Sequence, residues 1–127
     1  MSLSIDAFTI DCRDPRLLAD FWCLALDYRL IEVDDVGAEI TPDDGGSGPT
    51  FLFIIVPEGK TVKNRIHLDL RSSSSMAAEV ERMEALGATS ITRVDEGGSF
   101  WTVMADPEGN EFCVLRGPED GWTPDPS

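Results

Sequence analysis

The chain has 127 residues, of which 42% are hydrophobic, and this length suffices for one domain with a buried core. Its 24 Asp and Glu residues outnumber its 10 Lys and Arg residues, and the formal net charge is −14. Such an excess of carboxylates excludes nucleic acid and anionic membrane surfaces as partners, because both are negatively charged.

The sequence predicts a cytoplasmic protein. No run approaches the roughly 18 apolar residues of a membrane-spanning helix. The first residues lack the basic and apolar regions of a signal peptide. Three cysteines stand in apolar surroundings and form no CxxC pair; they are Cys12, Cys23 and Cys113. We expect them to be reduced, buried thiols.

The first half of the chain is predicted to form a strand, a helix and three further strands. Residues 4–12 alternate apolar and polar side chains, as in a strand with one buried face. Asp14 is expected to cap the next helix, with Pro15 at its first position. The apolar stripe of this helix consists of Leu17, Leu18, Phe21, Trp22 and Ala25. The three further strands are expected at 28–35, 37–43 and 50–58.

The second half repeats this plan. A strand is predicted at 64–70, and the helix after it begins at a serine cap and ends at Gly87. Three more strands follow at 89–96, 99–106 and 111–117, and DPEGN (106–110) forms a hairpin turn between the last two. A shift of 60 residues aligns the two halves. The matched residues are Ala25-Leu26 with Ala85-Leu86, Ile31 with Ile91, Asp35 with Asp95, and Gly37 with Gly97.

This organisation predicts a single α+β domain over residues 1–117, built from two tandem βαβββ modules. The modules are expected at about 4–60 and 61–117. Residues 118–127 are acidic and rich in Pro and Gly, so we expect them to form a flexible tail, in which Trp122 could still dock on the body or on a partner.

The tandem plan and three stretches of sequence resemble the vicinal oxygen chelate superfamily, in its glyoxalase-like, bleomycin-resistance-like branch. The stretches are RDPRLLADFWCLALDYRL, NRIHLDL and FWTVMADPEGNEFCVL, and the resemblance covers about residues 4–116. It implies a cupped, open barrel around a cavity, and a homodimer. It also implies one of two functions. Enzymes such as glyoxalase-type lyases and dioxygenases bind a divalent metal through the first and last strands of each module, whereas other members bind a small molecule without metal.

The resemblance places four metal-ligand positions on this chain. They fall on Ala7, on Leu52 or Phe53, on His67 and on Cys113. The first two positions offer no donor atom, which leaves one imidazole and one possible thiolate. Divalent metal sites generally use three or more protein donors. We therefore predict no metal cofactor, and a protein that binds a small organic molecule in a metal-free cavity.

His67, the only histidine, keeps three interpretations. Strand periodicity places it on one face with Asp69, and Glu111 on one face with Cys113, so the four side chains could gather in the cavity. They could then hold a displaced divalent metal in a lyase or dioxygenase, with His67, Glu111 and Cys113 as its ligands. Alternatively, His67 and Asp69 act as a metal-free general base. In the third interpretation His67 only hydrogen-bonds to a neighbouring group, and Cys113 packs as a small hydrophobic residue.

Aromatic side chains are expected to line the cavity. Trp101 and Phe53 are the preferred ligand-binding residues, together with Glu111 and Cys113. The remaining aromatic candidates are expected to lie mostly in the core; they are Trp22, Phe51, Phe100 and Phe112. An aromatic cup in an acidic protein suits a planar or cationic organic ligand.

Overall fold

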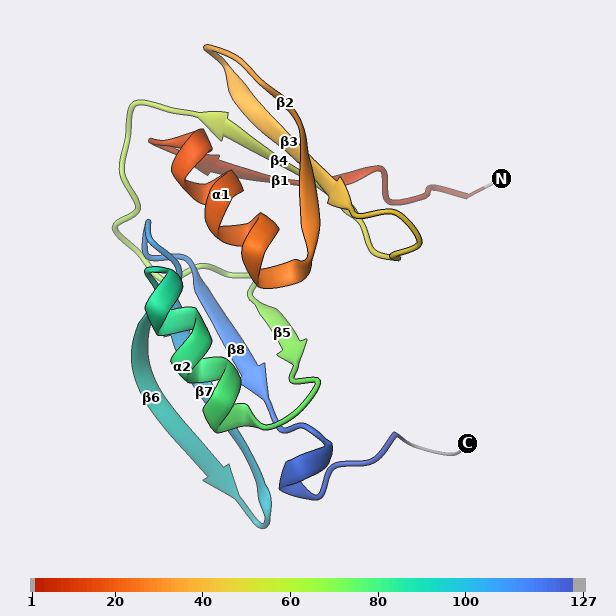
Figure 1. Ribbon diagram of the computed structural model, residues 1–127. Coiled ribbons are helices and arrows are strands. Elements are labelled where there is room, and N and C mark those ends of the chain that lie inside the picture. Colours follow the sequence, from red (N-terminus) through yellow and green to blue (C-terminus); the bar gives the residue numbers. More distant parts are fainter. Residues whose placement is uncertain (1, 125–127) are drawn as a thin grey trace. The chain divides into compact units, whose positions relative to one another are not determined.

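The computed structural model describes residues 2–124 and divides into two compact units, Met1–Thr61 and Val62–Ser127 (Figure 1). Each unit contains one four-stranded mixed sheet and one long helix that packs against it. The predicted α+β architecture of two βαβββ modules is confirmed. No described helix is both long and apolar enough to span a membrane.

The first unit has strand order β1-β4-β3-β2, with β1 parallel to β4 and the other neighbours antiparallel. Its elements are β1 (Ala7–Cys12), α1 (Pro15–Leu26), β2 (Tyr28–Val33), β3 (Gly37–Pro42) and β4 (Thr50–Ile55). The predicted helix cap is confirmed, since Asp14 Oδ1 accepts a hydrogen bond from the Leu17 backbone N–H at 3.1 Å. The buried residues of α1 are Leu18, Ala19, Phe21 and Trp22.

The second unit has the equivalent order, β5-β8-β7-β6, with β5 parallel to β8. Its elements are β5 (Leu68–Arg71), α2 (Met76–Leu86), β6 (Thr89–Glu96), β7 (Ser99–Ala105), β8 (Glu111–Leu115) and a short 3-10 helix (Pro118–Asp120). The predicted turn closes the β7–β8 hairpin, where the Asp106 N–H donates to the Asn110 carbonyl at 2.9 Å. The two sheets thus have the same strand order, as expected from the repeat predicted from the sequence.

The strand predicted at 64–70 is shorter than expected. β5 begins at Leu68, and residues 64–67 form an irregular segment. The β5–β8 ladder starts where Leu68 stands opposite Phe112, and β8 itself begins only one residue earlier. Residues 64–67 therefore lie beside a turn rather than a strand, so they have no ladder to join.

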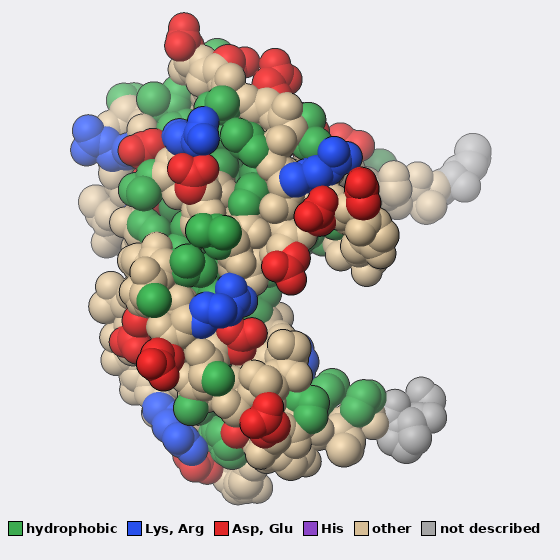
Figure 2. Space-filling model, in the orientation of Figure 1, with side chains coloured by type: hydrophobic (Ala, Val, Ile, Leu, Met, Phe, Trp, Pro, Cys, Tyr) green, Lys and Arg blue, Asp and Glu red, His purple; other side chains and the backbone are tan. Residues whose placement is uncertain are grey.

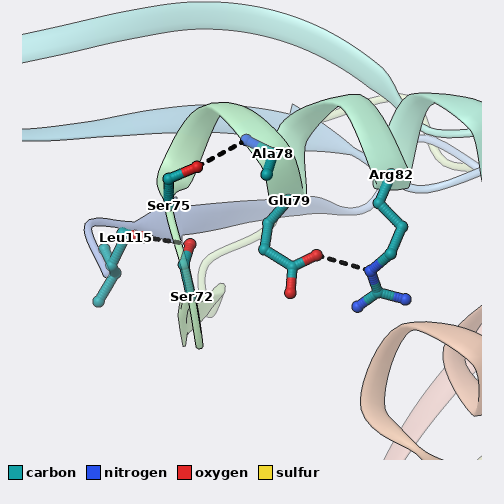
Figure 3. A network of polar contacts seen from close by, with 6 residues as sticks. All are labelled: Ser72, Ser75, Ala78, Glu79, Arg82 and Leu115. Atoms are coloured by element: carbon teal, nitrogen blue, oxygen red, sulfur yellow. Dashed lines mark hydrogen bonds and ion pairs between the residues drawn. The ribbon is translucent and has the colours of Figure 1, made fainter. Parts of the chain in front are cut away.

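Two serine side chains hold the start of α2 and the segment before it (Figure 3). Ser75 caps the helix, and its hydroxyl oxygen accepts a hydrogen bond from the Ala78 backbone N–H at 3.1 Å. Ser72 donates its hydroxyl hydrogen to the Leu115 carbonyl at 2.6 Å, which ties the approach to the helix to the end of β8. The predicted serine cap is confirmed.

The C-terminal segment is anchored rather than loose as far as Trp122. Asp120 Oδ2 accepts hydrogen bonds from the backbone N–H groups of Gly117 at 3.0 Å and Met76 at 2.7 Å, and these bonds lower the pKa of its carboxyl. The guanidinium carbon of Arg71 lies 4.1 Å from the centre of the Trp122 ring, a cation–π contact. Trp122 thus packs on the body of the second unit, one of the two outcomes expected for this segment, and residues 125–127 lie outside the described part.

Candidate functional site

A concave pocket of about 370 Å³ lies on the second sheet, on the face that points away from α2. Along β8, Phe112 and Val114 are buried in the core, and the alternate side chains face the pocket. Eight residues line it: Lys63, His67, Asp69, Trp101, Val103, Glu111, Cys113 and Leu115. All of them belong to the second unit.

The strand register explains which side chains meet. Asp69 of β5 and Val103 of β7 stand opposite Cys113 of β8, so the three share one face of the sheet. Trp101 stands opposite Leu115 and extends this face along the hairpin. The side chains of adjacent strands at one level lie about 5 Å apart, close enough to interact directly.

Three of the predicted site residues form a tight cluster in the pocket. His67 Nε2 lies 3.3 Å from Asp69 Oδ1. One donor atom each of His67, Asp69 and Cys113 lies within 4.8 Å of the others. The imidazole and the carboxylate are largely open to solvent, whereas Cys113 is 5% exposed. The cluster therefore consists of an accessible pair above a nearly buried thiol.

Cys113 carries a protonated thiol at neutral pH. Its pKa is raised to about 11, most of all by burial, and then by the negative charge of Asp69 and a hydrogen bond from the thiol to that carboxylate. Lys63 acts in the opposite direction. The thiol is therefore a hydrogen-bond donor to Asp69 rather than an activated nucleophile.

Replacing Asp69 by Asn should lower the pKa of Cys113, because the substitution removes a negative charge and a strong acceptor from beside the thiol. The Cβ carbon chemical shift of Cys113, followed by NMR between about pH 7 and 11, reports its ionisation directly. Asp95→Asn is the control, because Asp95 lies outside the pocket and pairs with Arg93. An unchanged Cys113 titration in the Asp69 variant would contradict this account.

Glu111 lines the pocket but does not join the three-residue cluster. Its Oε2 atom accepts a hydrogen bond from the Asn64 backbone N–H at 3.1 Å. The sequence analysis gave His67, Glu111 and Cys113 as the ligands of the alternative, displaced metal site. In the described part of the chain Asp69, not Glu111, completes the group.

Phe53, one of the two preferred ligand-binding aromatics, lies in the core of the first unit. Its side chain is 0% exposed, and its ring centre lies 6.3 Å from that of Phe51. No ligand can reach it there, so its assignment to the cavity was wrong. Strand alternation predicted the two faces of β4 but not which of them the helix covers. Trp101 does line the pocket.

The internal repeat shows which residues of the first unit occupy the equivalent positions. Leu52 in β4 corresponds to Cys113 in β8, because each lies between two buried side chains of its strand. The strand partner of Leu52 comes two residues after Ala7, and the strand partner of Cys113 comes two residues after His67. Ala7 at the start of β1 thus corresponds to His67 just before β5. Ala7 and Leu52 have no donor atoms, so the chain does not fit the four-donor metal set that the resemblance implied.

Sequence reasoning missed three lining residues. Val103 and Leu115 alternate with predicted pocket residues, so extending the same period of two along β7 and β8 would have found them. Lys63 comes from the irregular segment before β5, and no periodic signal marks it.

The family model described as Glyoxalase-like domain matches residues 7–115. The comparison with curated proteins gave no match.

Several solved structures share the fold. A glyoxalase/bleomycin resistance protein/dioxygenase family enzyme of Burkholderia phytofirmans PsJN is 19% identical over 88% of this chain and 97% of its own, with a TM-score of 0.69. A hypothetical protein of S. aureus is 16% identical over 91% of this chain and 94% of its own, with a TM-score of 0.70. The fosfomycin resistance protein FosX of Listeria monocytogenes, in complex with Mn(II) and sulfate, is 14% identical over 92% of each chain, with a TM-score of 0.74. At such identities the similarity concerns the fold alone.

Proposed function

The chain belongs to the glyoxalase-like domain family, and we propose that it binds a small organic molecule in the pocket of its second unit without a metal ion. The observation that carries this proposal is the pocket itself. Its volume of about 370 Å³ lies in the range typical of ligand sites, roughly 300–1,000 Å³. Trp101, Val103 and Leu115 supply an apolar surface, and the other lining residues supply polar anchors.

The charges of the pocket favour a cationic, flat ligand. Two carboxylates, those of Asp69 and Glu111, and one ammonium group, that of Lys63, line the pocket. A planar cation can stack on Trp101 while a carboxylate neutralises it. The net charge of −14 adds a long-range attraction for cations. Figure 2 shows carboxylates spread among hydrophobic and basic side chains over the visible face, rather than gathered in one patch.

His67 is proposed to act as a polar anchor for the ligand. Asp69 orients its imidazole from 3.3 Å, and the side chain remains 42% exposed, so it can contact a bound molecule. This role requires neither an ion nor an ionised thiol at Cys113. It agrees with the missing donors at Ala7 and Leu52.

A metal-dependent lyase or dioxygenase is the second candidate. One observation favours it: donor atoms of His67, Asp69 and Cys113 lie within 4.8 Å of one another. A catalytic zinc site commonly has three protein ligands. A metal would have to displace the proton of Cys113, whose pKa is about 11, and this lowers its apparent affinity at neutral pH.

A matched series of small aromatic compounds tests the proposal. Benzamidine, benzamide and benzoate have similar shapes and carry a positive, zero and negative charge. We expect binding in the order benzamidine, benzamide, benzoate, from strongest to weakest, measured by ligand-detected NMR with and without EDTA.

Three variants of the protein test the same pocket. Trp101→Ala should abolish detectable binding. Asp69→Asn should weaken benzamidine about two- to fivefold, because an exposed ion pair contributes about 0.5–1 kcal/mol. Asp95→Asn should leave binding unchanged.

Two results would change the conclusion. If benzoate binds best, or if Trp101→Ala binds as well as the wild-type protein, the cationic pocket is wrong. If EDTA abolishes binding and Zn²⁺ restores it in the wild-type protein but not in a His67→Ala variant, the metal-dependent candidate replaces the metal-free one.

A further inference from the structure

Residues 62–67 carry two of the pocket's polar side chains although they have no regular structure. Lys63 and His67 both come from this segment and line the pocket. The ladder with β8 starts only at Leu68. Something other than strand pairing must therefore place the segment against the sheet, because an irregular segment without such contacts samples many conformations.

A chain of hydrogen bonds connects this segment to the turn between β7 and β8. The Asn64 backbone N–H donates to Glu111 Oε2 at 3.1 Å, and the Asn64 side-chain amide donates to Asn110 Oδ1 at 3.0 Å. The Asn110 side-chain amide donates in turn to Asp106 Oδ2 at 3.0 Å. Asp106 is 3% exposed and holds the turn together, since its Oδ1 accepts from the Asn110 backbone N–H at 2.9 Å.

These contacts fix one residue from two sides. Asn64 is held through both its backbone and its side chain, by residues 46 and 47 positions further along the sequence. The partly buried Asn110 can donate to Asp106 and accept from Asn64 at the same time, because its amide group has both a donor and an acceptor. An aspartate at this position could only accept.

We propose that Asn64, Asp106, Asn110 and Glu111 form a latch that positions Lys63 and His67 at the pocket. Glu111 is then a positioning residue that acts through the backbone of Asn64, which accounts for its absence from the cluster of donor atoms. The DPEGN turn closes a hairpin and also holds the segment that completes the ligand site. The role of the latch at a ligand site rests on the proposed function, whereas its effect on the position of residues 62–67 does not.

Amide hydrogen exchange without any ligand tests the latch. We expect Asn64→Ala and Glu111→Ala to accelerate exchange over residues 62–67 about two- to tenfold, the effect of losing roughly one hydrogen bond. Glu111→Gln should restore slow exchange, because its amide oxygen can still accept from the Asn64 N–H. Exchange in β7 should not change in any of these variants. Glu81→Gln, on the exposed side of α2, is the matched control.

The single histidine provides a second measurement. Its Cε1–H proton gives one NMR signal, and this signal should move in Asn64→Ala, which leaves every charge of the pocket in place. Unchanged exchange in both alanine variants and an unmoved signal in Asn64→Ala would overturn the latch. If these changes appear but wild-type protein binds none of the three aromatic compounds, the latch stands and the proposed function fails. If wild-type protein binds benzamidine, Asn64→Ala should bind it more weakly, and equal binding would contradict positioning by the latch.

Discussion

Replacing Phe53 by alanine should lower the free energy of unfolding by about 3–5 kcal/mol, the usual cost of removing a buried aromatic side chain. Phe53 is 0% exposed and packs beside Phe51 under α1. A domain of this size is stable by only about 5–15 kcal/mol, so the loss would be a large part of the total. Urea denaturation followed by circular dichroism measures it.

Leu52→Ala is the matched control for this substitution. Leu52 is adjacent in the same strand but points to the opposite, partly exposed face. Its removal should cost about 1 kcal/mol, because less apolar surface is buried there. Equal losses in the two variants would mean that the two faces of β4 have been assigned wrongly.

Replacing Gly117 by alanine should destabilise the protein by about 1–3 kcal/mol through overpacking. A Cβ atom at Gly117 would overlap the Ser74 carbonyl oxygen, and would lie 2.7 Å from the Ser74 carbonyl carbon and 2.9 Å from the Ser72 carbonyl oxygen. These are backbone atoms, which cannot turn aside as a side chain can. The melting temperature and the unfolding free energy should both fall.

Gly59→Ala is the control for this second substitution. The nearest atom to its added Cβ would be Arg13 Cδ at 3.6 Å, an ordinary contact. The change should be neutral or slightly stabilising, because alanine restricts the unfolded chain more than glycine does. A Gly117→Ala variant as stable as the wild-type protein would show that the approach to α2 is looser than the structure describes.

The helices could be predicted from the sequence almost to the residue because their ends depend on local chemistry. Asp14 and Ser75 each cap a helix through their own side chains, and Gly87 ends α2 with a φ of 118°, a conformation that glycine adopts easily. Neither signal requires a distant partner. The repeat could be found for the same reason, since the last residues of the two helices, Leu26 and Leu86, match at the shift of 60 residues.

The strands and the site could be predicted only in part because they depend on distant partners. The alternation around His67 favoured a strand, but a strand also needs a neighbour to pair with, and β8 begins too late to pair with residues 64–67.

The sequence likewise carries no signal that Asp69, rather than Glu111, joins His67 and Cys113 in the cluster of donor atoms. That choice depends on the contact between Glu111 and Asn64, which are 47 residues apart.

The pairing of the first strand with the last in each unit has a consequence for synthesis on the ribosome. A nascent chain cannot complete either sheet until β4 or β8 has emerged, so β1 and β5 each wait unpaired while the rest of their unit is translated. The first unit can close while the second is still being made. The pocket forms last, because β8 brings Glu111, Cys113 and Leu115 to it. A translation pause before β8 would therefore leave a chain with one finished sheet and an exposed edge at β7.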